Sequence, residues 1–235
     1  MHRLLAVVTL LLAVGFAVSP LFSDGFNGFE PSQFPVEQDF WPVQPAGWAF
    51  SIWGVIFLWL IAGAGFGLWR RAEAPDWQAM RWPLAVSLFV GMFWIAVANA
   101  APVIATVMIV VMWITAVAAF LRAGRRDPLW QVAPVGLYAG WLTAATGVAI
   151  GVVAGGYGWL SAQAAALLCL TGVLAVAVGV QTARRDSWAY PLAVGWALLG
   201  VVAANLPSRN LPVIALALAG ILLLGYRHFT RKDMP

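Results

Sequence analysis

Tryptophan is the most conspicuous candidate for ligand-binding chemistry in this 235-residue sequence, which contains 14 tryptophan residues. Eight lie near the ends of long apolar segments, where indoles favour a membrane interface: Trp41, Trp48, Trp69, Trp77, Trp82, Trp130, Trp159 and Trp188. The other six lie deeper: Trp53, Trp59, Trp94, Trp113, Trp141 and Trp196. A buried indole N–H needs a hydrogen-bond acceptor or a polar cavity. The deeper group therefore supplies the better candidates for binding a ligand.

Three aromatic residues, Phe50, Trp53 and Phe57, repeat at i, i+3 and i+7, which places their rings on one face of a helix. Such a stripe fits both helix packing and the wall of a pocket, and both interpretations stay open. The preceding segment 23–45 combines five aromatic side chains (Phe26, Phe29, Phe34, Phe40 and Trp41) with four acidic ones (Asp24, Glu30, Glu37 and Asp39). Because a disordered linker would not carry so many aromatic residues, we expect this segment to fold back as a lid.

Ionisable side chains are scarce, and their placement excludes several classes of protein. The 13 basic and 9 acidic residues are all expected in loops or tails, whereas ion-coupled transporters keep such groups at membrane depth. The two histidines, His2 and His228, lie at the chain ends, so no general base is expected inside the membrane. We predict no catalytic residue, no metal site and no cofactor. The net charge of +4 is not clustered on a soluble face, so nucleic acid is not an expected partner.

Apolar segments dominate the chain, with 63% hydrophobic residues and a mean hydropathy of +0.87. A membrane-spanning helix needs about 20 apolar residues. Division of the uncharged intervals by that length predicts eight helices, at about 4–22, 48–69, 82–98, 103–121, 129–153, 159–180, 188–204 and 211–226. The expected fold is therefore an all-α, polytopic membrane bundle.

The basic residues give an independent test of this topology. With eight helices, every Lys and Arg except Arg209 falls on the same side as the N-terminus, as the positive-inside rule requires. We therefore expect both termini in the cytoplasm of a multi-pass protein in the inner or plasma membrane. The first helix could instead be a signal peptide, since residues 17–19 are small, but Pro20 directly after them favours an uncleaved helix.

Small residues mark a second face of the helix expected at 129–153. Four glycines lie on it, Gly136, Gly140, Gly147 and Gly151. This spacing allows another helix to approach closely, either within the chain or in a homodimer, and both alternatives stay open.

Two helical hairpins of the sequence resemble each other. Pro83-Leu-Ala-Val86 recurs as Pro191-Leu-Ala-Val194, and Asn99 and Asn205 each lie in the following turn. The two copies run in the same direction, which makes a parallel repeat. We interpret Asn99 as a turn residue, and the lining of an outward cavity is its alternative role.

Residues 45–57, which read Pro-Ala-Gly-Trp-Ala-Phe-Ser-Ile-Trp-Gly-Val-Ile-Phe, resemble the signature of the tryptophan-rich sensory protein family, also called TspO/MBR or translocator proteins. In that family a proline precedes a Trp-x-Phe-x-x-Trp pattern at the second helix. Pro134, Tyr138 and Trp141 are similar to its fifth-helix pattern. The chain departs from the family in two ways: Trp141 is followed by Leu-Thr where the family usually has Leu-Asn, and three further helices follow.

The resemblance implies a five-helix unit over residues 1–153, including the lid 23–45, and a three-helix extension over 154–235. It also implies a pocket for a porphyrin or sterol beneath the first loop, with a sensory or transport role. Together with the aromatic pattern, it gives nine candidate ligand-binding residues: Trp41, Trp48, Phe50, Trp53, Phe57, Trp94, Asn99, Tyr138 and Trp141.

Three functions remain in competition. The leading one is a binding or sensory membrane protein, whose partners are a flat hydrophobic ligand and membrane lipid. The alternative is a carrier or permease for a neutral small solute, in which the parallel repeats rock about a central path. An enzyme that degrades a bound pigment ranks last, because no general base is expected at depth.

Overall fold

The computed structural model describes residues 2–23, 25–36 and 38–230, and these residues form an all-helical bundle without strands. Its helices are α1 (His2–Val18), α2 (Ile52–Arg70), α3 (Pro75–Ala100), α4 (Pro102–Arg122), α5 (Ala133–Gly156), α6 (Ala162–Ala183), α7 (Ala189–Asn205) and α8 (Leu211–Phe229). Seven, extended in places by short helical turns, are long and apolar enough to cross a membrane, and α7 is apolar but shorter, with 17 residues. The expectation of an all-α polytopic bundle is therefore confirmed.

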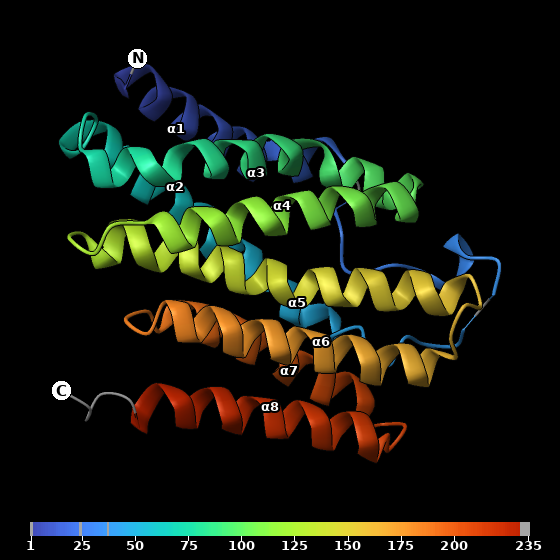
Figure 1. The fold of residues 1–235 in the computed structure, drawn as a ribbon. Helices are drawn as coiled ribbons and strands as arrows, with labels where there is room; N and C mark the ends of the chain where they lie inside the picture. The colour runs from blue at the N-terminus through green and yellow to red at the C-terminus, as the bar shows by residue number, and fades with distance from the viewer. Residues whose placement is uncertain (1, 24, 37, 231–235) are drawn as a thin grey trace.

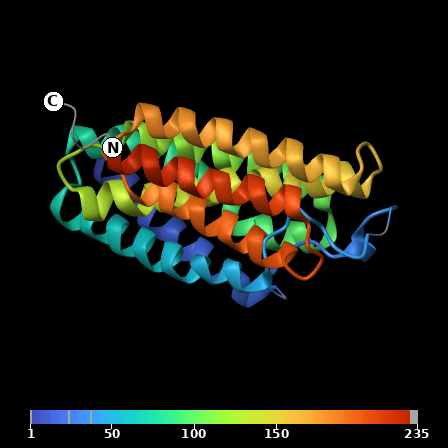
Figure 2. The same cartoon turned by 90° about the horizontal axis from the view of Figure 1, so that it is seen from below.

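The bundle has two dissimilar ends. Figures 1 and 2 show that α1 begins and α8 ends at one end, where the α2–α3, α4–α5 and α6–α7 turns also lie. Because these turns and the adjoining helix ends carry most of the arginines, we call this the arginine-rich end. The segment between α1 and α2 lies at the other end, which we call the loop end (Figures 1 and 2). Five charged residues counted above lie outside the described residues: Asp24, Glu37, Arg231, Lys232 and Asp233.

Helix α5 is the centre of the bundle, with 20 of its 24 residues buried. Its small residues let two neighbours approach closely: a Cβ added to Gly140 would lie 2.4 Å from the carbonyl oxygen of Tyr190 in α7, and one added to Gly147 would lie 2.2 Å from Val173 in α6. Without a hydrophobic force between helices in lipid, such close van der Waals contact is what holds them together. Thus α5 joins the first four helices to the last three within one chain.

One helix boundary differs from the prediction. Helix α3 begins at Pro75, seven residues before the expected start at Trp82. Pro75 occupies the first turn, where a missing N–H costs nothing, and Asp76 favours the same turn through the helix dipole. Consequently Asp76 and Arg81 are helical, and the expectation that every charged residue lies in a loop or tail is wrong.

Three charged residues are also buried, contrary to expectation: Arg81, Asp127 and Arg184. Arg81, which is 2% exposed, donates to the carbonyl oxygens of Gly67, Arg71 and Ala72 at the end of α2. Arg184 donates to carbonyl oxygens at the end of α4, among them that of Phe120 at 2.9 Å. The last carbonyls of a helix have no partner within it, so these guanidinium groups cap two helices.

Trp77 is buried rather than interfacial, because its indole has a partner inside the protein. Its Nε1 donates to Asp127 Oδ2 at 2.9 Å, and Asp127 also forms an ion pair with Arg71. Hydrogen bonds from Arg71 hold the pKa of Asp127 below its usual range, although burial opposes this shift. Arg71, Trp77 and Asp127 therefore form a matched polar cluster at the arginine-rich end.

Candidate ligand-binding site

The loop between α1 and α2 folds back into the mouth of the bundle. Phe29 and Phe34 are buried there. The Gln33 side chain donates to the carbonyl oxygens of Ala98 and Asn99 at 3.0 and 3.1 Å, and Asn99 Nδ2 donates to Gly25 O at 3.0 Å. These bonds tie the loop to the α3–α4 turn.

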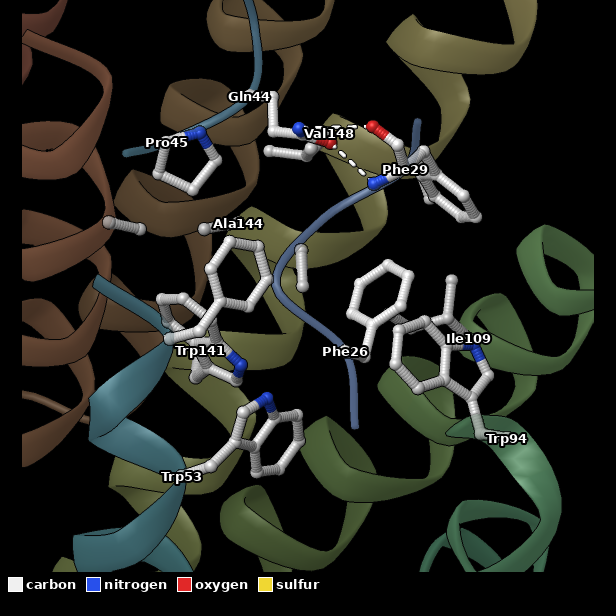
Figure 3. Close-up of a pocket in the computed structure, with 14 residues that line it drawn as sticks. Phe26, Phe29, Gln44, Pro45, Trp53, Trp94, Ile109, Trp141, Ala144 and Val148 are labelled. Carbon is white, nitrogen blue, oxygen red and sulfur yellow. Dashed lines mark hydrogen bonds between the residues drawn. The ribbon is translucent and has the colours of Figure 1, made fainter. Parts of the chain in front are cut away.

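A small apolar cavity lies beneath this loop (Figure 3). It is walled by the loop and by residues of α2, α3, α4, α5 and α7: Phe26, Phe29, Gln44, Pro45, Phe50, Trp53, Trp94, Ile109, Trp141, Ala144, Ala145, Val148, Ala149 and Ala197. Its free volume is about 20 Å³, which is room for about one water molecule. The site is therefore closed in this structure.

Phe26 is the loop side chain that fills most of the space between the aromatic walls. Its ring lies 4.8 Å from that of Trp94 and 5.8 Å from that of Phe50, in both cases edge to face. This geometry is the favoured one for aromatic pairs. Phe26 thus acts as a plug held by the walls that a ligand would contact.

The buried indoles differ in how their N–H groups are satisfied. Trp94 Nε1 donates to Ala105 O at 2.9 Å, and Trp59, Trp113 and Trp196 also have acceptors. Trp141 is only 2% exposed, yet its Nε1 has no partner among the described residues. Figure 3 shows this nitrogen beside the indole nitrogen of Trp53. The ring centroids of Trp53 and Trp141 are 6.1 Å apart. The cavity therefore holds a donor that lacks an acceptor.

Gln44 locks the loop across the cavity. Its Oε1 accepts from the backbone N–H of Phe29 at 2.8 Å, and its Nε2 donates to Phe29 O at 3.3 Å (Figure 3). The adjacent Gly28 has φ +120°, and a Cβ there would collide with the Gln44 amide. Only glycine adopts this conformation readily, so Gly28 allows the lock to close.

Six of the nine candidate residues lie at or directly below the cavity. Phe50, Trp53, Trp94 and Trp141 line it. Phe57 stacks on Trp53 with centroids 5.1 Å apart. Tyr138 is fully buried, and its hydroxyl lies 2.8 Å from that of Ser87. The last two support the cavity floor instead of lining it.

The other three candidates lie outside the cavity. Trp41 is buried against Phe34, whose ring centroid is 5.3 Å away. Trp48 is 46% exposed and packs on Trp196. Asn99 is exposed and holds the loop through Gly25. The structure thus places these three at the periphery.

Sequence reasoning did not single out several residues that line the cavity, among them Gln44 and Ala197. Gln44 acts through a partner 15 residues earlier in the chain, and Ala197 belongs to α7, beyond the five helices used to define the pocket. Neither residue lies on a periodic pattern that could have revealed it.

Comparison with known proteins gives one match. None of the curated proteins and none of the solved structures compared with the chain match it. A family model described as TSPO-like protein matches residues 5–227, a range that begins within α1 and ends within α8. The chain therefore belongs to the TSPO-like family.

Proposed function

We propose that this membrane protein is a receptor or sensor that binds a flat apolar ligand, such as a porphyrin or a sterol, in the cavity beneath the loop. The unpaired N–H of Trp141 is the observation that carries this proposal. A buried donor without an acceptor costs about 1–3 kcal/mol, and an acceptor on a ligand would recover that cost. Membership of the TSPO-like family supports the same site.

The walls define the chemistry of the ligand. Aromatic rings and small alanines form most of the lining, and Gln44 is its only amide. Since no charged side chain among the described residues lines the cavity, an ionised substituent would have to stay at the loop mouth, in contact with water. The ligand we expect is therefore broad and apolar, with an oxygen or nitrogen acceptor that reaches Trp141.

Binding requires the loop to move. Sites for ligands of this size have volumes of roughly 300–1,000 Å³, whereas the closed cavity has about 20 Å³. Withdrawal of Phe26 from between Trp94 and Phe50 would join the cavity to the loop surface. We therefore expect slow association, limited by loop opening.

We also infer that the arginine-rich end faces the cytoplasm, as the positive-inside rule requires, so that the loop and the cavity face the opposite side. A Cys169→Ser background with one new cysteine tests this orientation. A membrane-impermeant maleimide added to intact cells should label Ser208→Cys, in the exposed α7–α8 turn, and should not label Arg125→Cys. The reverse pattern would invert the orientation.

Ligand titration tests the binding proposal. Protoporphyrin IX and cholesterol would be added to the protein in lipid nanodiscs while tryptophan fluorescence is followed. We expect saturable quenching by at least one of them, with about tenfold weaker affinity for Trp141→Phe, because the variant loses a hydrogen bond in an apolar site.

Trp59→Phe is the matched control. The Trp59 indole already donates to Leu129 O and does not line the cavity, so its replacement should not affect affinity. The absence of saturable quenching by both compounds, or equal affinities for Trp141→Phe and the wild type, would refute the proposed site.

A further inference from the structure

Helix α7 makes three hydrogen bonds to the segment that leads from the loop into α2. We call this segment, Pro42–Ser51, the strap. Trp196 Nε1 donates to Ala49 O at 2.8 Å, and Asn205 Nδ2 donates to Pro42 O at 2.8 Å. In the opposite direction, the strap's Ala46 N–H donates to Gly200 O at 3.0 Å. The second half of the strap forms a short 3-10 helix, Gly47–Ser51, and α7 pairs three further backbone groups of the strap, the carbonyls of Pro42 and Ala49 and the N–H of Ala46.

The strap also packs directly on the backbone of α7. A Cβ added to Gly200 would lie 2.7 Å from the Cβ of Ala49 and 2.8 Å from that of Pro45. The next turn of α7 places Trp196 edge to face on Trp48, with centroids 5.1 Å apart. A glycine and an indole on one side of α7 thus form a seat for the strap.

The strap carries the residues that shape the cavity. Pro45 and Phe50 belong to its wall, and Gln44 grips the backbone of Phe29 through both amide atoms. A continuous set of contacts therefore runs from α7 through the strap and Gln44 to the loop. Ala197, one residue after Trp196, completes this wall from α7 itself.

We propose that α7 positions the ligand-binding site, with Trp196 and Asn205 as positioning residues that hold the strap and, through Gln44, keep the loop closed. The role in ligand affinity rests on the proposed function, whereas the control of the loop does not. Helix α8 packs on α7 and α6 and so supports α7 from the outer side of the bundle. The last three helices then belong to the functional unit and are not an accessory extension.

Hydrogen–deuterium exchange of the full chain in nanodiscs tests this proposal. The double variant Trp196→Phe/Asn205→Leu removes two bonds to the strap and keeps an aromatic ring on Trp48. We expect the amides of Phe29 and Ala46 to exchange about tenfold faster, because each lost bond changes a local equilibrium several-fold. Peptides from α5 should exchange at the wild-type rate, and the melting temperature should stay within a few degrees.

Two further variants distinguish the loss of contacts to the strap from a general effect of losing an indole hydrogen bond. Trp196→Phe alone should give a smaller increase of about threefold at the same amides. Trp59→Phe loses an equivalent indole-to-carbonyl bond, from the middle of α2 to Leu129 O, and should leave the loop unchanged. An unchanged exchange rate at Phe29 in the double variant, or an equal increase in α5, would overturn the proposal.

Binding of protoporphyrin IX provides the second readout. If the wild type binds it, the double variant should bind about tenfold more weakly, and equal affinities would overturn the role of α7 in the site. If the wild type binds neither protoporphyrin IX nor cholesterol, the proposed function fails, and the exchange rates still decide whether α7 controls the loop.

Discussion

Two buried indoles, Trp77 at the arginine-rich end and Trp141 near the loop end, differ in whether their N–H groups have an acceptor. At the arginine-rich end, Arg81 and Arg184 donate to the carbonyls that close α2 and α4, and the Trp77 indole donates to Asp127. Near the loop end, the equally buried Trp141 indole has no acceptor among the described residues. A matched donor stabilises the fold, whereas an unmatched one has a cost that a bound acceptor can remove. The contrast separates the end that buried arginines fix from the end at which we propose that a ligand binds.

The two ends also differ in how they can open. The polar bonds at the arginine-rich end connect the ends of long helices and involve charged groups, which form the stronger hydrogen bonds. The loop is tied by neutral amide bonds from Gln33, Gln44 and Asn99. Local opening with low free energy is therefore expected at the loop end.

Arg184→Ala should have the largest effect on stability. It removes the cap of α4 and leaves several carbonyls without a donor, so we expect a loss of roughly 2–4 kcal/mol. The control is Arg122→Ala, since Arg122 is exposed at the end of the same helix. Unfolding of both variants in mixed micelles would measure this, and equal losses would contradict a structural role for the buried guanidinium.

Gly140→Leu should be next, because the new side chain meets the backbone of α7 at Tyr190. Overpacking costs about 1–3 kcal/mol. Since α7 also seats the strap, this variant should speed amide exchange in the loop as well as lower the melting temperature. Gly172→Leu is the control, because a Cβ at Gly172 meets open space. If Gly140→Leu lowered the melting temperature but left amide exchange in the loop at the wild-type rate, the α5–α7 contact would have no influence on the ligand-binding site.

Asp127→Asn should change the pH dependence of stability. The pKa of Asp127 is lowered in the folded protein, chiefly by hydrogen bonds from Arg71, so its contribution is present above the unfolded pKa of about 4 and is lost as the pH falls through the folded value. We expect the wild type to lose stability between about pH 5 and pH 3 more steeply than the variant. Parallel curves from thermal unfolding at each pH would count against this ion pair.

Phe26→Ala should have the smallest effect on the fold and a selective effect on binding. It removes three edge-to-face contacts, with Phe29, Phe50 and Trp94, each worth about 0.5–1.5 kcal/mol, that hold the plug in place. Stopped-flow mixing with protoporphyrin IX should show association several-fold faster than in the wild type, with melting nearly unchanged. Slower association would mean that Phe26 guides the ligand instead of blocking it.

Periodicity and charge predicted the elements well where one helix face or one turn carried the signal. Uncharged intervals predicted the eight helices, and i, i+3, i+7 spacing placed Trp53 of α2, and Phe50 in the short helical turn before it, on the cavity side. The start of α3 was missed because Arg81 ended the uncharged interval, although Arg81 and Trp77 are both buried and have hydrogen-bond partners in other segments. Those partners leave no periodic trace.

The candidate site was predictable only in part, for the same reason. Trp94 and Trp141 could be selected as deep indoles, but their sequence does not say that Trp94 is satisfied by Ala105 and Trp141 is not. The Gln44–Phe29 lock and the strap–α7 contacts join distant residues through backbone atoms. Backbone partners carry no residue-type signal, so these features needed the fold.

Parallel measurements on Trp77→Phe and Trp141→Phe test the contrast between the two ends most directly. The two indoles are 1% and 2% exposed, so both variants lose a similar buried volume and differ mainly in the hydrogen bond. We predict that Trp77→Phe is less stable than Trp141→Phe by about 1 kcal/mol and binds protoporphyrin IX like the wild type, whereas Trp141→Phe binds about tenfold more weakly. Equal stabilities together with equal affinities would contradict the division into a structural end and a binding end.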